Sequence, residues 1–174
     1  TYGTDSDEAY RFSVYKKNYA YVSSTNARQS SYKVSLNKFA DMTNEEFKAQ
    51  YRNLKQKTTP RNVKLLNEYN VPSSVDWRGS AVTGVKDQGQ CGSCWAFSVV
   101  CAVESANAIT NGVSALQSYS EQQLVDCAGG QYRNEGCNGG NQTWAFSYMQ
   151  DNGDMLESAY PYTAQDGYCQ YDAS

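Results

Sequence analysis

The sequence predicts an α+β fold in which helices dominate. Apolar and aromatic side chains recur every three to four positions over residues 6–24 and cover broad faces of residues 94–110, as they do on amphipathic and buried helices. Thr43 and Ser120 are each followed three positions later by Glu or Gln, which is a capping box that marks a helix start. With 174 residues, the chain is long enough for one domain with an appended module.

The first part of the chain, residues 1–66, is expected to combine two helices with a short strand and a linker. Residues 31–39 alternate partly between polar and apolar side chains, which favours a short strand. The capping box at Thr43 then opens the second helix. Residues 55–64 are basic and polar and contain a proline, which is typical of an extended linker.

The second part, residues 71–174, is expected to alternate helices with turn-rich loops. A turn-rich segment leads into the helix over residues 94–110, and the capping box at Ser120 opens the next helix. Residues 127–141 hold five glycines and show no periodicity, so they are expected to form a loop. Residues 144–150 have the pattern of a short amphipathic helix.

Charge is divided unevenly along the chain. Residues 1–66 carry 12 Lys and Arg against 6 Asp and Glu, whereas residues 67–174 carry 3 against 12. A basic arm is compatible with nucleic-acid binding. Mutual attraction of two oppositely charged parts is the simpler interpretation, because the basic part is patterned as helix. We therefore expect no nucleic-acid partner, and no run approaches the roughly 20 apolar residues of a membrane span.

Cysteine and histidine usage limits the possible chemistry. Six cysteines lie in the second part, and the sequence alone does not choose among their pairings. Their position beside Gly-rich loops favours an oxidising compartment. The chain contains no histidine, so these residues hold no Cys–His or Ser–His pair and no histidine-ligated metal. We expect neither a cofactor nor a metal.

Residues 88–97 contain the thiol that we expect to be reactive. They read Gln-Gly-Gln-Cys-Gly-Ser-Cys-Trp-Ala-Phe, with Cys94 at the start of the predicted helix. The positive end of the helix dipole favours a thiolate there, and the glycines before it allow a substrate backbone to approach closely. Gln88, six residues upstream, can offer an amide N–H to a developing oxyanion.

Two other interpretations of the Cys-x-x-Cys pattern are open at this point. A redox dithiol is expected after a strand in a βαβ setting, whereas a Gly-rich loop precedes Cys91. A zinc ribbon requires two such pairs, and the chain has one. Both interpretations are therefore less favoured than a catalytic thiol.

Several segments resemble papain-like cysteine peptidases of the cathepsin L-like subfamily: V-D-W-R, V-K-D-Q-G-Q-C-G-S-C-W-A-F-S, S-E-Q-Q-L-V-D-C, G-C-N-G-G and Y-P-Y,. The resemblance implies a papain-like fold. Residues 71–174 look like its left, mainly helical domain, so that the β-rich right domain is absent from this chain. Residues 1–66 resemble the inhibitory prosegment, and residues 67–70 form the junction.

The prosegment resemblance depends on two spaced patterns. The first is typical of a long helix, departs from the family by like-for-like changes at three positions, and comprises Asp7, Arg11, Tyr15, Asn18, Val22 and Asn26. The second has serine where the family usually has glycine, and comprises Ser35, Asn37, Phe39 and Asp41. This long-prosegment pattern is similar to that of cathepsin L and unlike that of cathepsin B.

The resemblance also implies roles at matching positions. Cys94 is the implied nucleophile, and the Gln88 side chain and the Cys94 backbone N–H form the implied oxyanion hole. Backbone hydrogen bonds to the substrate and the pocket for the second residue before the scissile bond are implied for a further set: Gly92, Gly139, Gly140, Asn141 and Gln142.

The remaining cysteines and one sequon have implied roles as well. The implied disulfides join Cys91 to Cys137 and Cys127 to Cys169. Cys101 has no partner in the family and is expected to be a buried, inert thiol. Asn141-Gln142-Thr143 is an N-glycosylation sequon,, and a glycan there would crowd the pocket that it borders.

These features predict a latent precursor of a cysteine endopeptidase that cleaves peptides and proteins through a Cys94 thioester. The family's catalytic histidine and asparagine lie in the second domain, so a second chain or segment is expected to supply them and this chain alone to be inactive. The linker, at about residues 55–70, would lie over Cys94 against the substrate direction until acid-triggered cleavage near Asn70-Val71.

Alternatives to this prediction remain. The chain could be a non-catalytic papain-like structural or binding module, or a prosegment that inhibits other peptidases in trans. A lysosomal or vacuolar location, or secretion, fits the expected disulfides.

Overall fold

The structure is a computed structural model that describes residues 3–52, 54 and 72–171. It divides into two compact units, Thr1–Gln50 and Tyr51–Ser174, called unit 1 and unit 2 below. The expected linker over residues 55–64 and the expected cleavage at Asn70-Val71 lie outside the described residues. The boundary between prosegment and mature domain therefore stays a prediction.

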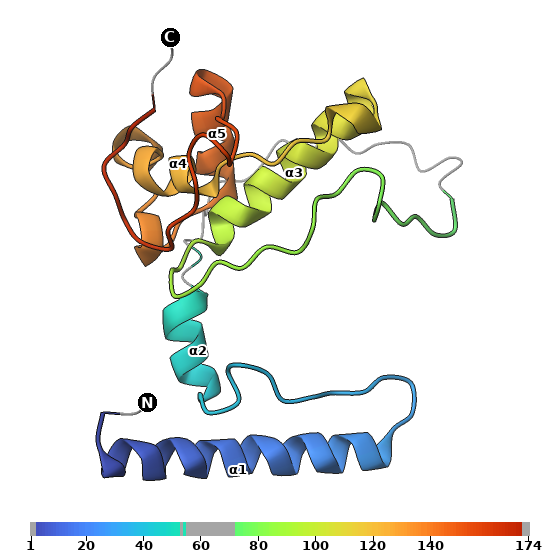
Figure 1. Cartoon of the computed structure of the whole chain (residues 1–174), viewed down its shortest axis with the longest axis vertical. Coiled ribbons are helices and arrows are strands. Elements are labelled where there is room, and N and C mark those ends of the chain that lie inside the picture. Colours follow the sequence, from blue (N-terminus) through green and yellow to red (C-terminus); the bar gives the residue numbers. More distant parts are fainter. Residues whose placement is uncertain (1–2, 53, 55–71, 172–174) are drawn as a thin grey trace. The chain divides into compact units, whose positions relative to one another are not determined.

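Unit 1 begins with a long, largely exposed helix, α1, which spans Asp5–Arg28 (Figure 1). The Thr4 side chain accepts the Asp7 N–H at 3.1 Å and caps the first turn,. The first turn is acidic and Arg28 lies in the last, so charges at both ends favour the helix dipole,. The predicted helix over residues 6–24 is thus confirmed and extends one turn further.

The predicted strand over residues 31–39 is wrong, because this segment has no partner strand among the described residues. Side chains of α1 satisfy its backbone groups instead. Asn26 donates to the Val34 carbonyl at 2.7 Å and accepts the Val34 N–H at 2.9 Å. Further along, Asn18 donates to the Ala40 carbonyl at 2.8 Å. Amide side chains can replace a strand partner because they offer both a donor and an acceptor.

The second helix, α2 (Asn44–Tyr51), begins at the predicted capping box. The Thr43 hydroxyl accepts the Glu46 N–H at 3.2 Å, and a Glu46 carboxylate oxygen accepts the Thr43 N–H at 2.7 Å,. This hydrogen bond from Thr43 is the main cause of a lowered Glu46 pKa. Arg11 forms an ion pair with Glu46 at 3.0 Å, so the capping box also connects α1 to α2.

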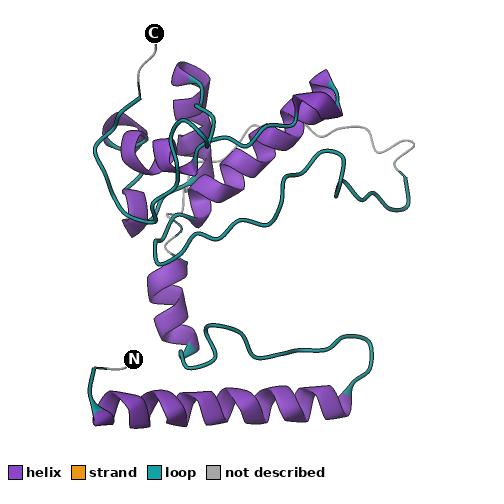
Figure 2. Cartoon of the chain, in the orientation of Figure 1, coloured by secondary structure: helices purple, strands orange, loops and turns teal. Residues whose placement is uncertain are grey.

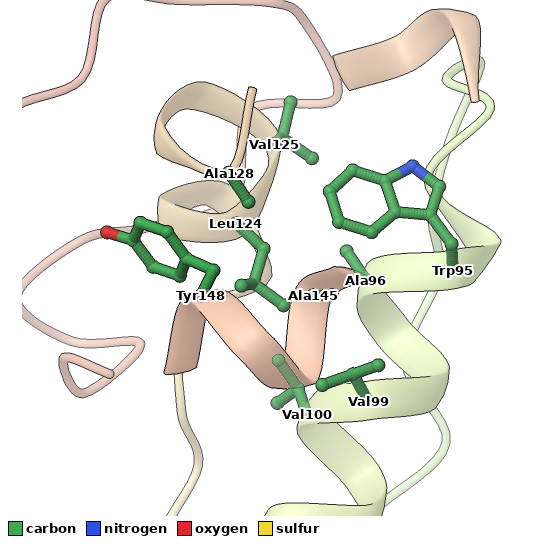
Figure 3. Packing of buried hydrophobic residues seen from close by; sticks show 9 residues of the cluster. All are labelled: Trp95, Ala96, Val99, Val100, Leu124, Val125, Ala128, Ala145 and Tyr148. Atoms are coloured by element: carbon green, nitrogen blue, oxygen red, sulfur yellow. The ribbon is translucent and has the colours of Figure 1, made fainter. Parts of the chain in front are cut away.

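Unit 2 packs three helices around one apolar core. α3 (Cys94–Asn111) crosses α4 (Glu121–Cys127) and α5 (Gln142–Asn152), and the described part of the chain contains helices and loops without a strand (Figure 2). Short 3-10 turns, η1 (Val113–Ala115), η2 (Gly130–Tyr132) and η3 (Gly136–Asn138), lie between them. Figure 3 shows the core side chains pointing toward one another: Trp95, Ala96, Val99, Val100, Leu124, Val125, Ala128, Ala145 and Tyr148.

The capping box predicted at Ser120 is correct in one half only. The Ser120 hydroxyl accepts the Gln123 N–H at 2.9 Å. The Gln123 amide does not return to Ser120, however, because it accepts the Met155 N–H at 2.7 Å and donates to the Tyr148 hydroxyl at 3.1 Å. The glutamine therefore connects α4 to α5 and to the segment that follows α5.

A buried group of charges in unit 2 joins Lys86 to α3 and α4. Lys86 Nζ is 2.8 Å from a Glu104 carboxylate oxygen and 2.7 Å from a Glu121 carboxylate oxygen. The two glutamate side chains are 0% and 2% exposed. Burial raises the pKa of Glu121, which the hydrogen bond from Lys86 only partly offsets. Burial and the Glu121 charge also raise the pKa of Asp154, to about 8.

Two disulfides bind the loops of unit 2 to its helices. Cys91 is bonded to Cys137 and Cys127 to Cys169, the pairing that the family resemblance implies. The first closes 46 residues and the second 42, and crosslinks of that length restrict the unfolded chain strongly.

Of the helices that the structure describes, none has the length and apolar character needed to cross a membrane.

Candidate active site

Cys94 is the first residue of α3 and carries a free, half-buried thiol. Burial raises the pKa of this thiol,. The backbone N–H groups of Trp95 and of Cys94 itself act in the opposite direction, as does the positive charge of Arg52. The helix N-terminus thus favours the thiolate, as expected for a reactive cysteine, but it offsets the effect of burial only in part,.

The loop before Cys94 is held to the Gly-rich segment across from it. The Gly92 N–H donates to the Cys137 carbonyl at 2.9 Å, next to the Cys91–Cys137 disulfide. The Gln88 side-chain amide donates to the Cys91 carbonyl at 2.7 Å. Because an amide nitrogen carries two hydrogens, this bond orients Gln88 with one N–H still able to act as a donor.

Gly140 lies flat against the ring of Trp95, the residue after Cys94. A Cβ at Gly140 would lie 2.6 Å from the Trp95 ring and 2.5 Å from the Asn134 side-chain oxygen. The same oxygen accepts the Asn141 N–H at 2.8 Å. These contacts hold the segment close beside α3, and Leu54 pairs with Gly140 in a parallel bridge.

Replacing Gly140 with alanine is expected to destabilise unit 2 by about 1–3 kcal/mol, the usual effect of overpacking a fixed site. Both close neighbours are held: the Trp95 indole donates to the Gly136 carbonyl at 3.1 Å, and the Asn134 side chain donates to the Ala128 carbonyl at 3.0 Å. Urea unfolding measures the change. Gly84→Ala is the matched control, because a Cβ at Gly84 meets nothing within 4 Å. Equal stabilities of the two variants would contradict the close approach.

The sequon asparagine has a structural partner. Asn141 is 7% exposed, and its side-chain oxygen accepts the Thr143 N–H at 2.9 Å as the N-cap of α5,. A glycan would be attached to the side-chain nitrogen of Asn141, and the burial of this residue leaves little room for it. Gln142, the first residue of α5, is half-buried and is the more accessible of the two residues expected to border the pocket.

The expectation that Cys101 is buried is wrong, because the structure leaves this thiol exposed. Seven residues are close to two helical turns, so Cys101 lies on the same face of α3 as Cys94. The opposite face, with Trp95, Val99 and Val100, is the one that packs into the core. Because apolar residues occur on all sides of this helix, the sequence did not indicate which face is buried.

Tyr162 also belongs to the site, although the sequence did not single it out. Its hydroxyl donates to the Gln88 carbonyl at 2.8 Å and lies 2.6 Å from the Ser93 hydroxyl. Its ring packs edge-on against Phe97 with centroids 4.8 Å apart. The Y-P-Y segment was the available signal, but a separation of 69 residues from Ser93 gives no local indication of this contact.

Both parts of the chain match known protein families. Residues 71–174 match the family described as papain family cysteine protease, and residues 1–47 match the cathepsin propeptide inhibitor domain. Digestive cysteine proteinase 1 of Homarus americanus is 44% identical over 97% of this chain and 54% of its own length. Vignain of Phaseolus vulgaris is 50% identical over 91% of this chain and 46% of its own length.

A solved structure supports the same assignment. Digestive procathepsin L 3 from the larval midgut of Tenebrio molitor superposes with a TM-score of 0.78 and 41% identity, over 99% of this chain and 57% of that chain. The chain thus spans about half the length of the curated relatives that it matches.

A helical fold with a free cysteine at a helix N-terminus beside a glycine segment is the arrangement expected of the N-terminal half of a thiol protease. The chain belongs to the papain family of cysteine proteases. It has a cathepsin-type propeptide inhibitor domain as its intramolecular prosegment.

Proposed function

We propose that these residues are the latent precursor half of a cysteine endopeptidase, with Cys94 as its nucleophile. The single observation that supports this most directly is the position of the free Cys94 thiol at the N-terminus of α3, where backbone N–H groups favour the thiolate. The thiolate would attack the scissile carbonyl, form a thioester as the amine leaves, and be released by water.

The oxyanion of that attack requires fixed donors. We assign them to the Gln88 side-chain amide and the Cys94 N–H, because Gln88 is already oriented by its bond to the Cys91 carbonyl and donors fixed in advance need no reorganisation. Gly92, Gly139 and Gly140 would border the substrate backbone, and Gln142 the pocket beside it. Removal of one such donor costs about 100- to 1000-fold in turnover.

We assign latency to the chain that follows α2. Leu54 pairs with Gly140 in a parallel bridge, and the positive charge of Arg52 acts to lower the pKa of Cys94. If the substrate pairs with Gly140 in the antiparallel sense, the parallel sense of the Leu54 bridge supports the expected prosegment that lies against the substrate direction. The boundaries proposed for it are residues 1–66, with a junction at residues 67–70 before the domain over residues 71–174.

General acid and base steps need groups beyond these 174 residues, which contain no histidine. We propose that a histidine and an orienting asparagine come from another segment or chain and that the 174 residues alone do not turn over peptides. The two disulfides support an oxidising location, and we propose a lysosomal, vacuolar or extracellular one.

The test is peptide hydrolysis by a protein that joins residues 1–174 to the histidine-bearing domain of a papain-family relative. After incubation at low pH the joined protein is expected to cleave peptides, and Cys94→Ser to lower the rate by at least about 1000-fold. Cys101→Ser is the matched control, since its thiol is equally free and is expected to be dispensable. Activity that survives Cys94→Ser would refute the assignment, and an inactive joined protein would favour the non-catalytic module.

A further inference from the structure

The glutamine proposed as an oxyanion donor is held by its backbone as well as by its side chain. The Gln88 carbonyl accepts the Tyr162 hydroxyl at 2.8 Å, and the Gln88 side-chain amide donates to the Cys91 carbonyl at 2.7 Å. The two bonds act at opposite ends of the same residue. Because hydrogen bonds at both ends limit the orientations of a side chain, the tyrosine helps to set the direction of the remaining Gln88 side-chain N–H.

The direction of the bond to Gln88 follows from its acceptor. The Tyr162 hydroxyl has one hydrogen and a carbonyl only accepts, so the hydrogen is donated to Gln88,. The Ser93 hydroxyl, 2.6 Å away, must then donate to the Tyr162 oxygen. Ser93 is fully buried, and burial also raises the pKa of the Tyr162 phenol. The hydroxyl therefore keeps the hydrogen that it donates to Gln88.

The segment that carries Tyr162 is itself fixed to the rest of unit 2. The Tyr162 N–H donates to a Glu157 carboxylate oxygen at 2.9 Å. The side chain of Gln122 in α4, which is only 2% exposed, accepts the Thr163 N–H at 2.9 Å and donates to the Gln165 carbonyl at 2.8 Å. These bonds lie on both sides of residue 164, so the segment forms a fixed support beside Gln88.

The same segment packs against the residue that follows Gln88. Ala164 has a left-handed backbone with φ 59°, which residues other than glycine adopt rarely. Its Cβ faces Gly89, where an added Cβ would lie only 2.9 Å from it. Such a conformation persists where the surrounding contacts determine it. One supported segment thus contacts two successive residues of the oxyanion loop.

We propose that Tyr162 is a positioning residue for Gln88: its hydroxyl fixes the Gln88 backbone and thereby directs the remaining side-chain N–H toward the oxyanion. This role rests on the proposed peptidase function, in which Gln88 stabilises the negative charge on the attacked carbonyl. A donor of this kind is effective when it is held in place before the charge develops. Loss of the hydroxyl should therefore slow the chemical step and leave substrate binding nearly unchanged.

The first experiment measures the mobility of the Gln88 side-chain amide by NMR relaxation of its nitrogen in the 174-residue chain. Tyr162→Phe keeps the ring and removes the hydroxyl. We expect an ordered Gln88 amide in the wild type and an order parameter below about 0.6 in the variant, while the buried Gln123 amide stays unchanged as internal reference. Tyr132→Phe is the matched control, because its ring also packs edge-on against an aromatic ring and its hydroxyl bonds to Asp151 at 2.9 Å.

The second experiment measures peptide hydrolysis by the protein that joins residues 1–174 to a histidine-bearing domain. Tyr162→Phe is expected to lower kcat about tenfold, the effect of one hydrogen bond, and to change KM by less than about twofold. Gln88→Ala is expected to lower kcat about 100- to 1000-fold. In the Gln88→Ala protein, Tyr162→Phe should have no further effect, because the residue through which it acts is gone. A merely structural tyrosine would lower the rate by the same factor in both proteins.

An equally ordered Gln88 amide in the wild type and in Tyr162→Phe, or equal factors with and without Gln88, would overturn the proposal. If Tyr162→Phe does not fold, the wild-type amide decides alone: an order parameter of about 0.85 supports the proposal, and one below about 0.6 refutes it. If the joined protein is inactive, the proposed function fails, while the relaxation measurement still decides whether Tyr162 positions Gln88. The two failures are therefore distinguishable.

Discussion

Replacing Lys86 with methionine is expected to destabilise unit 2 by about 3–5 kcal/mol at pH 7, the usual effect of removing one member of a buried ion pair. Burial by itself would lower the pKa of Lys86, but its hydrogen bonds to Glu104 and Glu121 outweigh burial and raise it. Without the ammonium, two carboxylates that are 0% and 2% exposed would face each other uncompensated.

Urea unfolding at pH 7 and at pH 4.5 measures this effect. The loss should be smaller at pH 4.5, because Glu121, whose pKa burial raises, can then take up a proton in place of the ammonium,. Arg78→Met is the matched control: Arg78 forms an ion pair with Asp76 in which the side chains are 85% and 54% exposed. Exposed pairs contribute only about 0–1 kcal/mol. A loss at Lys86 no larger than the loss at Arg78 would contradict the burial of this pair.

Asp154→Asn is expected to stabilise unit 2 at pH 7 by on the order of 2–4 kcal/mol. Both carboxylate oxygens of Asp154 are buried and have no hydrogen-bond partner in the described part of the chain. Burial, and after it the charge of Glu121, raises the pKa of Asp154 from 3.8 to about 8. The native chain therefore holds a proton that the unfolded chain releases.

The sign of the pH dependence follows from that raised pKa. The native state loses no stability through Asp154 below about pH 4, where the acid is neutral in both states. The loss grows as the pH rises and is complete above about 8.

Asp154→Asn should flatten this slope and leave stability at pH 4 nearly unchanged, as unfolding free energies between pH 4 and 8.5 would show. Asp151→Asn, at an exposed position, is the control, with an expected change within about 0.5 kcal/mol. A parallel pH slope in wild type and Asp154→Asn would contradict a buried neutral acid.

The helices were predictable because local patterns determine where they begin. The Thr43 capping box and the helix start at Cys94 lie where the sequence predicts them. The structure of residues 31–39 was not predictable, because partial alternation indicates an extended chain but does not say which groups satisfy its backbone. Asn26 of α1 satisfies this segment, and such a contact depends on tertiary packing.

The candidate site divides in the same way. Residues 88–94 are contiguous, so a pattern of residue types sufficed to select Gln88 and Cys94. Tyr162 contributes from 69 residues further along the chain, and only the folded loop shows that its hydroxyl reaches Ser93. The face of α3 on which Cys101 lies likewise depends on which side packs against α4 and α5.

The two disulfides interleave along the chain, since Cys127 lies within the loop closed by Cys91 and Cys137. One cut at any peptide bond between Cys91 and Cys169 therefore leaves both fragments covalently joined. The four bonded cysteines divide this region into three intervals, and one cut in each of any two intervals still leaves all fragments joined. Only when all three intervals are cut once do the fragments separate, into two disulfide-linked pairs. Single proteolytic cuts in this region would therefore appear on a gel only after reduction, and the fragment that holds Cys94 would stay covalently joined to the rest.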